Sequence, residues 1–174
     1  LDLDLVEEIQ FLKKGEFLDL GTGPGTQAIE LAKRGFNVTG SDVSSAAIEK
    51  AKLLSSSVNF IIDNILNSKF QDNSFDYILD RGCFHVLSDV ERITYLHQTK
   101  RILKKNGMFF LKCMSKEEKI LVNDKGPHKF NKKEIIGYFE NDFNIEKIKN
   151  TVYYGTLEPL PKALFFVMKK LVKL

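Results

Sequence analysis

The feature that most constrains this chain is a regular alternation of short apolar runs with segments of helical periodicity. Consecutive apolar residues indicate buried strands, whereas apolar residues three and four positions apart indicate helices. Ser44 is an N-cap residue, and Ser88 with Glu91 and Asn131 with Glu134 have the spacing of a capping box. The pattern predicts strands at 16–20, 37–40, 58–62, 75–79, 108–113, 143–154 and 163–168, and helices at 5–12, 26–33, 44–54, 88–103 and 131–140.

Strands that alternate with helices imply a mostly parallel sheet with helices on both faces and right-handed crossovers. The last two strands have no helix between them, so we expect an antiparallel pair at one edge. No repeat or linker interrupts the order, and we therefore predict one domain spanning residues 1–174, an α/β, Rossmann-like, doubly wound fold. Ligands of such sheets bind beyond the carboxyl ends of the strands, which makes the residues after each strand the candidates for a site.

Composition narrows the class of protein. Of the 174 residues, 43% are hydrophobic and 28% charged, as in globular domains. The longest apolar run, 163–168, is too short to cross a membrane. Two cysteines without C-x-x-C spacing predict neither a disulfide framework nor a structural zinc site, and we expect no metal. Without a basic and apolar leader, a reduced, cytoplasmic protein is expected.

The charge is unevenly distributed along the chain. Residues 1–99 carry 9 Lys or Arg and 15 Asp or Glu, whereas residues 100–174 carry 17 and 8. A basic half is one mark of an anionic partner. However, 22 of the 26 basic residues are lysines scattered along predicted helices, and arginine, which forks around phosphates, occurs four times. A nucleic-acid partner is therefore disfavoured.

A glycine cluster follows the first predicted strand, in the sequence Asp19-Leu-Gly21-Thr-Gly23-Pro-Gly25. Glycine lets the backbone turn sharply and approach a ligand, and the helix that follows offers free N–H groups. Asp42 ends the second strand, where its carboxylate can accept both hydroxyls of a ribose. This arrangement suits a nicotinamide dinucleotide as well as an adenosyl cofactor.

Two details separate these cofactors. The dinucleotide pattern G-x-G-x-x-G requires a third glycine at position 26, where this chain has Thr26. Asp19 lies two residues before the first glycine, where its charge would repel a pyrophosphate but attract a sulfonium and an ammonium group. The residues therefore favour S-adenosylmethionine as the cofactor.

At this point the sequence closely resembles the class I S-adenosylmethionine-dependent methyltransferases. The segment FLDLGTGPGTQAIELAKRGFNVTGSDVSSAAIEKAK is similar to the first two motifs of that family. VNFIIDNILNSKFQDNSFDYILDRGCFHVL is similar to the next two, and RILKKNGMFFLKC to the motif of the fifth strand. The resemblance implies a seven-stranded sheet in the order 3-2-1-4-5-7-6, with strand 7 antiparallel.

The resemblance also implies roles for the residues at the strand ends. The methionine part of the cofactor would be held by Asp19, Gly21, Thr22 and Gly23, and the ribose by Asp42, with Val43 against the adenine. The aspartate that accepts the adenine amino group in this family aligns with Asn64, so Asp63 and Asn64 are both candidates, with Ile65 beside them. Asp80 would lie near the methyl-bearing sulfur.

The methyl acceptor is expected beside Asp80-Arg81-Gly82-Cys83-Phe84-His85. The segment lacks the prolines of the [N/D]-P-P-[Y/F] sequence found in amino-directed nucleic-acid methyltransferases. Its D-R-G sequence resembles the thiopurine and tellurite-resistance methyltransferases. His85 is a candidate base or orienting group, and Arg81 either attracts an anionic acceptor or forms a salt bridge with a carboxylate such as Asp80.

Three further residues and one segment are candidates on the acceptor side. Cys83 and Cys113 end neighbouring strands, so their sulfurs could lie close together, and His128 lies at the same end of the sheet. The irregular segment 114–131 is a candidate lid. We therefore predict methyl transfer to a heteroatom of a small molecule, such as a thiol, selenol or metalloid oxyanion. An RNA or protein methyltransferase and a non-enzymatic nucleotide-binding module are the alternatives, and no oligomeric state is predicted.

Overall fold

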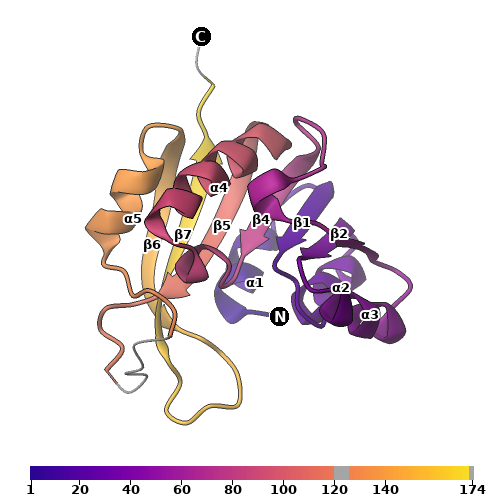
Figure 1. Ribbon diagram of the computed structural model, residues 1–174, viewed down its shortest axis with the longest axis horizontal. Coiled ribbons are helices and arrows are strands. Elements are labelled where there is room, and N and C mark those ends of the chain that lie inside the picture. Colours follow the sequence, from indigo (N-terminus) through magenta and orange to yellow (C-terminus); the bar gives the residue numbers. More distant parts are fainter. Residues whose placement is uncertain (120–125, 173–174) are drawn as a thin grey trace.

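The computed structural model describes residues 1–119 and 126–172, and the described residues form one seven-stranded sheet (Figure 1). The strand order is β3-β2-β1-β4-β5-β7-β6. β1 pairs with β2 and with β4 in parallel, as do β2 with β3 and β4 with β5, whereas β7 is antiparallel to both β5 and β6. The predicted α/β fold, strand order and antiparallel strand 7 are confirmed.

The helices and strands lie close to their predicted bounds. The α-helices are α1 (Leu3–Ile9), α2 (Thr26–Lys33), α3 (Ser45–Leu54), α4 (Asp89–Ile102) and α5 (Lys132–Phe139), with short 3₁₀ helices η1 (Ile65–Asn67) and η2 (Phe84–Val86). The strands are β1 (Glu16–Leu20), β2 (Asn37–Asp42), β3 (Asn59–Ile62), β4 (Phe75–Asp80), β5 (Leu103–Met114), β6 (Phe143–Val152) and β7 (Lys162–Lys170). Both predicted capping boxes form, at Ser88 and at Asn131.

One predicted boundary is wrong. The sequence predicts a strand over 108–113, but β5 already begins at Leu103 and includes Asn106-Gly107, a pair typical of turns. Asn106 adopts φ 61° within the strand, and the pairing with β4 shifts register between Phe75 and Tyr77. The Asn-Gly pair is thus accommodated as an irregularity inside a strand instead of a turn before it.

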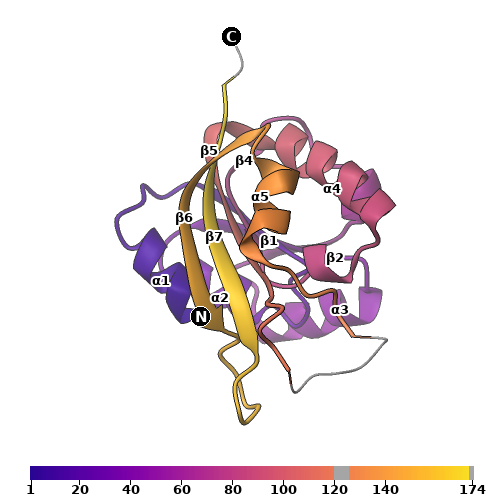
Figure 2. The ribbon, with the colours of Figure 1, turned by 90° about the vertical axis from the view of Figure 1, so that its left-hand side faces the viewer.

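The helices divide between the two faces of the sheet, and each face has its own core. One core joins α1, α2 and α3 to the sheet through residues such as Leu5, Leu31 and Ile48. The other joins α4 and α5 to it through Tyr95 and Phe139. Figure 2 shows α1 on one side of the β6–β7 pair and α4 on the other. No helix among the described residues is long and apolar enough to cross a membrane.

A buried cluster of charges fastens α1 to the sheet. Lys112, which is 1% exposed on β5, places its Nζ 2.7 and 2.8 Å from the two carboxylate oxygens of Asp2 and 2.8 Å from Asp4 Oδ2. Asp4 also accepts a hydrogen bond from Thr151 Oγ1 and pairs with Lys149. Burial alone would raise the pKa of Asp4, but its bonds to Lys112, Lys149 and Thr151 hold it below the usual value.

We expect Lys112→Met to destabilise the protein strongly, because it leaves two buried carboxylates without their central cation. Loss of one partner from a buried pair lowers the free energy of unfolding by about 3–5 kcal/mol. Urea unfolding followed by circular dichroism measures the change. Lys147→Met is the matched control, since Lys147 pairs with Glu8 at the surface and should change stability by less than about 1 kcal/mol. Equal losses in the two variants would contradict a structural role for the cluster.

Candidate functional site

A cavity of about 240 Å³ opens at the carboxyl ends of the parallel strands. It lies where the strand order reverses, with β1 between β2 and β4, which is the position at which sheets of this type bind ligands. Its walls come from the ends of β1, β2, β3 and β4 and from η1 and η2. The lining residues are Leu20, Gly21, Ser41, Asp42, Val43, Asp63, Ile65, Gly82, Cys83 and Val86.

The glycine loop forms the floor on the β1 side. Gly21 and Gly23 adopt φ angles of 69° and 54°, and a Cβ built on Gly23 would meet nothing within 4 Å, so the backbone borders open space there. Gly25, at φ 82°, caps α2, and a Cβ on it would lie 2.6 Å from the Phe60 ring. The loop therefore requires glycine for its conformation at all three positions, and at Gly25 for space as well.

Asp19 anchors the glycine loop from below. Its Oδ2 accepts hydrogen bonds from Thr22 Oγ1 at 2.6 Å and from the backbone N–H of Ala28 at 3.1 Å. Burial raises the pKa of Asp19 to about 6, against the effect of these two hydrogen bonds. A cation that bound nearby would favour the ionised form and lower this pKa again.

Asp42 lies at the end of β2 and faces the same space. Its Oδ2 accepts from the backbone N–H of Gly23 at 2.9 Å and its Oδ1 from that of Ser44 at 2.9 Å. Each carboxylate oxygen keeps a further lone pair. Val43, which is 66% exposed, presents an apolar side chain to the cavity next to this carboxylate.

The structure distinguishes the neighbouring candidates Asp63 and Asn64. Asp63 is 7% exposed and lines the cavity; its Oδ1 accepts from the backbone N–H of Lys69, but its buried Oδ2 has no hydrogen-bond partner among the described residues. Asn64 is exposed, and its side chain caps η1 by accepting from the Leu66 N–H. The free buried acceptor on this wall therefore belongs to Asp63, with buried Ile65 beside it.

Asp80 is held by its own loop. Its Oδ1 accepts from the backbone N–H groups of Gly82 and Cys83, and its Oδ2 from that of Phe84 and from Tyr95 Oη at 2.5 Å. Burial raises the pKa of Asp80, opposed by these hydrogen bonds. The carboxylate is 0% exposed and does not line the cavity, so its observed role is to shape the loop that does.

Arg81 turns away from Asp80 and toward the N-terminal helix. Its Nε lies 2.8 Å from Asp2 Oδ2, its Nη2 donates to the Tyr154 carbonyl oxygen at 2.8 Å, and its guanidinium lies over the Tyr153 ring. Of the two predicted alternatives, the salt bridge forms, but with Asp2 and not with Asp80. No local sequence pattern predicts this pairing, because the partners are 79 residues apart.

The cysteine and histidine candidates lie in different surroundings. Cys83 lines the cavity, whereas Cys113 is buried in the core between the sheet and α4 and α5. Burial and the charges of Asp80 and Asp42 raise the pKa of the Cys83 thiol. His85 is buried behind Gly82, and the ring of exposed His128 packs on Phe130. No group of three or more potential metal ligands occurs among residues 1–119 and 126–172.

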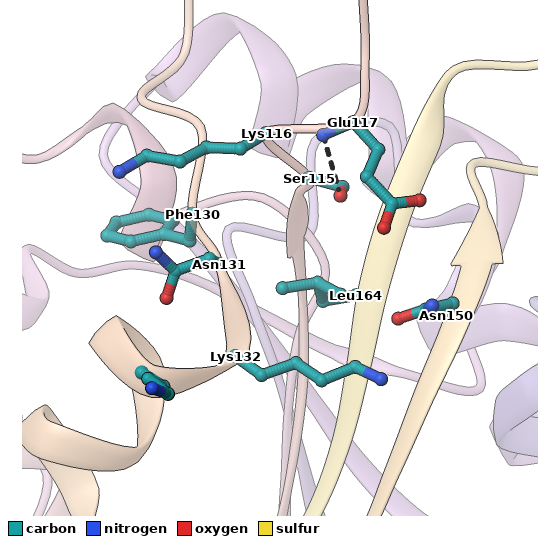
Figure 3. Close-up of a pocket in the computed structure, with 9 residues that line it drawn as sticks. Ser115, Lys116, Glu117, Phe130, Asn131, Lys132, Asn150 and Leu164 are labelled. Carbon is teal, nitrogen blue, oxygen red and sulfur yellow. Dashed lines mark hydrogen bonds between the residues drawn. The ribbon is translucent and has the colours of Figure 1, made fainter.

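A second cavity of about 420 Å³ lies between the end of β5, the start of α5 and the β6–β7 pair (Figure 3). Its residues include Lys116, Lys132 and Lys133, above an apolar surface formed by Phe130 and Leu164. Figure 3 shows the Lys132 side chain extending toward Asn150 and the Glu117 backbone N–H bonded to Ser115 Oγ. It shares no residue with the first cavity. The predicted lid, 114–131, borders it, although residues 120–125 lie outside the described residues.

Sequence reasoning missed several residues of the first cavity. Ser41 is 0% exposed, and its Oγ has no hydrogen-bond partner among the described residues. Gly82 adopts φ 137°, and Val86 is 66% exposed at the rim. Ser41 directly precedes Asp42, and Gly82 stands within the D-R-G sequence, so position after a strand was the available signal.

Comparison with known proteins agrees with this geometry. A family model described as "Methyltransferase domain" matches residues 17–107, which contain all the lining residues of the first cavity. The chain belongs to this methyltransferase family. Its cofactor is S-adenosylmethionine, and the acceptors and glycines around the cavity are compatible with it.

Solved structures of this family share the whole fold. A SAM-dependent methyltransferase from Methanosarcina mazei superposes with a TM-score of 0.86 at 20% identity, covering 99% of this chain and 100% of that one. TehB from Haemophilus influenzae gives 0.80 at 18% identity, covering 98% and 62%. At these identities the similarity establishes the fold.

Among curated relatives, the human "EEF1A lysine methyltransferase 2" is 33% identical over 121 residues, 62% of this chain and 50% of the relative. The chain thus spans about half the length of that relative.

We expect Asp63→Asn to weaken binding of S-adenosylhomocysteine, because an amide nitrogen or a neutral oxygen replaces the free carboxylate oxygen in the cavity wall. A hydrogen bond to a charged group contributes about 1.5–3 kcal/mol, so the loss should be roughly tenfold or more in Kd. Isothermal titration calorimetry measures it. Asn64→Ala is the matched control and should change Kd less than threefold, roughly the effect of a lost cap. The reverse order of effects would assign the adenine contact to Asn64.

Proposed function

We propose that this protein transfers the methyl group of S-adenosylmethionine to a heteroatom of a small molecule, such as a thiol, a selenol or a metalloid oxyanion. The observation that carries the proposal is the first cavity, where two buried oxygens, Asp63 Oδ2 and Ser41 Oγ, have no partner among the described residues beside an open glycine loop. An unpaired buried acceptor is unfavourable unless a ligand completes it. These oxygens fit a polar, hydrogen-bond-donating ligand.

The residues around the cavity divide naturally between the parts of the cofactor. Asp42 would accept the ribose hydroxyls, and Asp63 the adenine amino group, with Val43 and Ile65 against the faces of the ring. The backbone of Gly21, Thr22 and Gly23 and the charge of Asp19 would hold the methionine part. When bound, the cofactor supplies an electrophilic methyl group on a positively charged sulfur.

The chemistry of the β4 wall supports an acceptor that is already nucleophilic. On that side the cavity is lined by Gly82, Cys83 and Val86, none of which is a base at neutral pH, because the pKa of Cys83 is raised. The two carboxylates that line the cavity lie across it, on β2 and after β3. Orientation can supply most of the acceleration when no proton has to be removed, about 7–11 kcal/mol. Thiolates and selenolates meet this condition.

A protein acceptor is the second candidate, supported by the relatives named as EEF1A lysine methyltransferases. A lysine ammonium group must lose a proton before it attacks, so this reaction would need a base from the acceptor protein or from residues outside the cavity wall. The lysines of the second cavity would then serve as a docking surface for acidic side chains.

An acceptor panel with radiolabelled cofactor distinguishes the two candidates. We expect label to pass to thiophenol, selenite, tellurite or a thiopurine, with rates that change little between 50 and 300 mM salt. Transfer to RNA should instead fall steeply with salt, because phosphate contacts release counterions. Asp42→Ala, which removes the proposed ribose acceptor, is the control for enzyme-dependent transfer. Labelling of RNA or of protein lysines alone would overturn the small-molecule proposal.

The raised pKa of Asp19 predicts pH-dependent cofactor binding. Above pH 6 Asp19 is ionised and attracts the ammonium of S-adenosylhomocysteine; below pH 6 it takes up a proton and the attraction is lost. We expect Kd to rise by up to about tenfold from pH 7 to pH 5. In Asp19→Asn this dependence should vanish, with weaker binding at pH 7. A wild-type pH profile retained in Asp19→Asn would show that another group titrates.

A further inference from the structure

His85 occupies the turn between the cofactor cavity and the end of β5. It lies in η2, its side chain is 8% exposed, and its backbone oxygen accepts a hydrogen bond from the His128 N–H at 2.7 Å. A buried imidazole in such a position serves either as a base or as a donor. The role of the imidazole depends on which of its two nitrogens carries the proton.

The backbone of β5 determines that choice. The backbone N–H of Met114 donates to His85 Nδ1 at 3.1 Å. β4 ends at Asp80, which pairs with Leu111, so Met114 lies beyond the last residue that β4 can bond. Without His85 this buried N–H would have no strand partner on that side. A proton on Nδ1 would leave it unsatisfied, at about 1–3 kcal/mol, and Nδ1 is therefore the lone-pair nitrogen.

Tyr153 lies on the same side of the imidazole. Its hydroxyl lies 3.3 Å from His85 Nδ1 and donates to the Lys112 carbonyl oxygen at 2.9 Å. If the hydroxyl rotated toward the imidazole, it would donate to the same Nδ1 lone pair. The Tyr153 contact fits either tautomer, so the Met114 N–H is the group that places the proton of the neutral ring on Nε2.

Nε2 lies beside Gly82, a residue of the cofactor cavity wall. A Cβ on Gly82 would come within 3.2 Å of Nε2, and Gly82 has φ 137°, which disfavours any side chain there. Nε2 makes no hydrogen bond with the described residues, in contrast to Nδ1. Because Gly82 has no side chain, that residue does not cover Nε2 where it faces the cavity wall.

We propose that His85 is a fixed hydrogen-bond donor that selects an anionic methyl acceptor through Nε2–H, and that it is not a general base. The proposal rests on the methyl-transfer function proposed above and names the property its acceptor must have. An anionic nucleophile forms the new bond to carbon with its own electron pair. The electrons of the broken S–CH₃ bond stay on sulfur, which becomes neutral. No proton is removed, so no base is required.

The charges around His85 favour the neutral ring. Burial and the positive charge of Arg92 on α4 together lower its pKa to about 4. Tyr153 faces it from the end of β6, and burial raises the pKa of that phenol, so it stays neutral. Asp80 and Arg81, in the same loop, are held by their own hydrogen bonds and by Asp2, and the His128 contact is made by its backbone. The donor is therefore present throughout the physiological pH range.

Nitrogen NMR of the ¹⁵N-histidine-labelled wild-type protein tests the state of the ring without any acceptor. We expect His85 to remain neutral from pH 5 to pH 8, with the proton on Nε2 and a lone pair on Nδ1. The exposed His97 in the same spectra is the internal reference. A proton on Nδ1, or titration of His85 between pH 6 and 7, would overturn the proposal. This result is independent of whether the methyl-transfer proposal holds.

Variants then test the role in transfer, using thiophenol or selenite as the acceptor. His85→Gln retains an N–H donor and an acceptor for Met114, and we expect kcat/KM within about threefold of the wild type. His85→Leu lacks both and should lose about 10- to 100-fold, with the Kd of S-adenosylhomocysteine unchanged. A pH-rate profile that loses an ionisation near pH 6 in His85→Gln would identify a base instead. Equal activity of His85→Leu and the wild type would remove His85 from the reaction.

Discussion

The arrangement of this protein depends on carboxylates at the ends of parallel strands that are bound by backbone N–H groups. Asp42 is bound to Gly23 and Ser44, and Asp80 to three successive amides of its loop. These bonds fix the turns that leave the sheet, so that the cavity walls keep their shape without a ligand. Because the strands are parallel and in register, the turns all meet at one edge.

At the carboxyl ends of the strands, carboxylates whose oxygens all have hydrogen-bond partners differ in role from a carboxylate with an oxygen that has none. Asp80 has all its bonds within the protein and shapes the loop, whereas Asp63 keeps one buried oxygen without a partner among the described residues. Identical side chains at equivalent strand ends therefore serve structure in one place and are available for recognition in another. The hydrogen bonds of each oxygen separate the two cases, and residue type alone does not.

Much of the fold was predictable from the sequence, because strand and helix periods, capping boxes and the glycine loop are local signals. The positions of Asp19, Asp42 and Asp63 at strand ends followed from the same signals. What the sequence did not predict depends on contacts between distant segments. Arg81 pairs with Asp2, and the Met114 N–H meets His85, because β4 and β5 end at different levels. Whether Asp63 or Asn64 is the candidate for the adenine contact depends on which side chain caps η1, and this is decided by the geometry of a single turn.

The buried charges on α1 have a consequence for how the chain is made. Asp2 and Asp4 precede their partners Lys112 and Thr151 by 110 and 147 residues along the chain. Until β6 has emerged from the ribosome, Asp4 lacks Thr151 and Lys149, and the charge cluster that holds α1 is incomplete. Domains generally fold as units during synthesis. Here α1 precedes the sheet in the chain but completes its contacts only after β6 has formed.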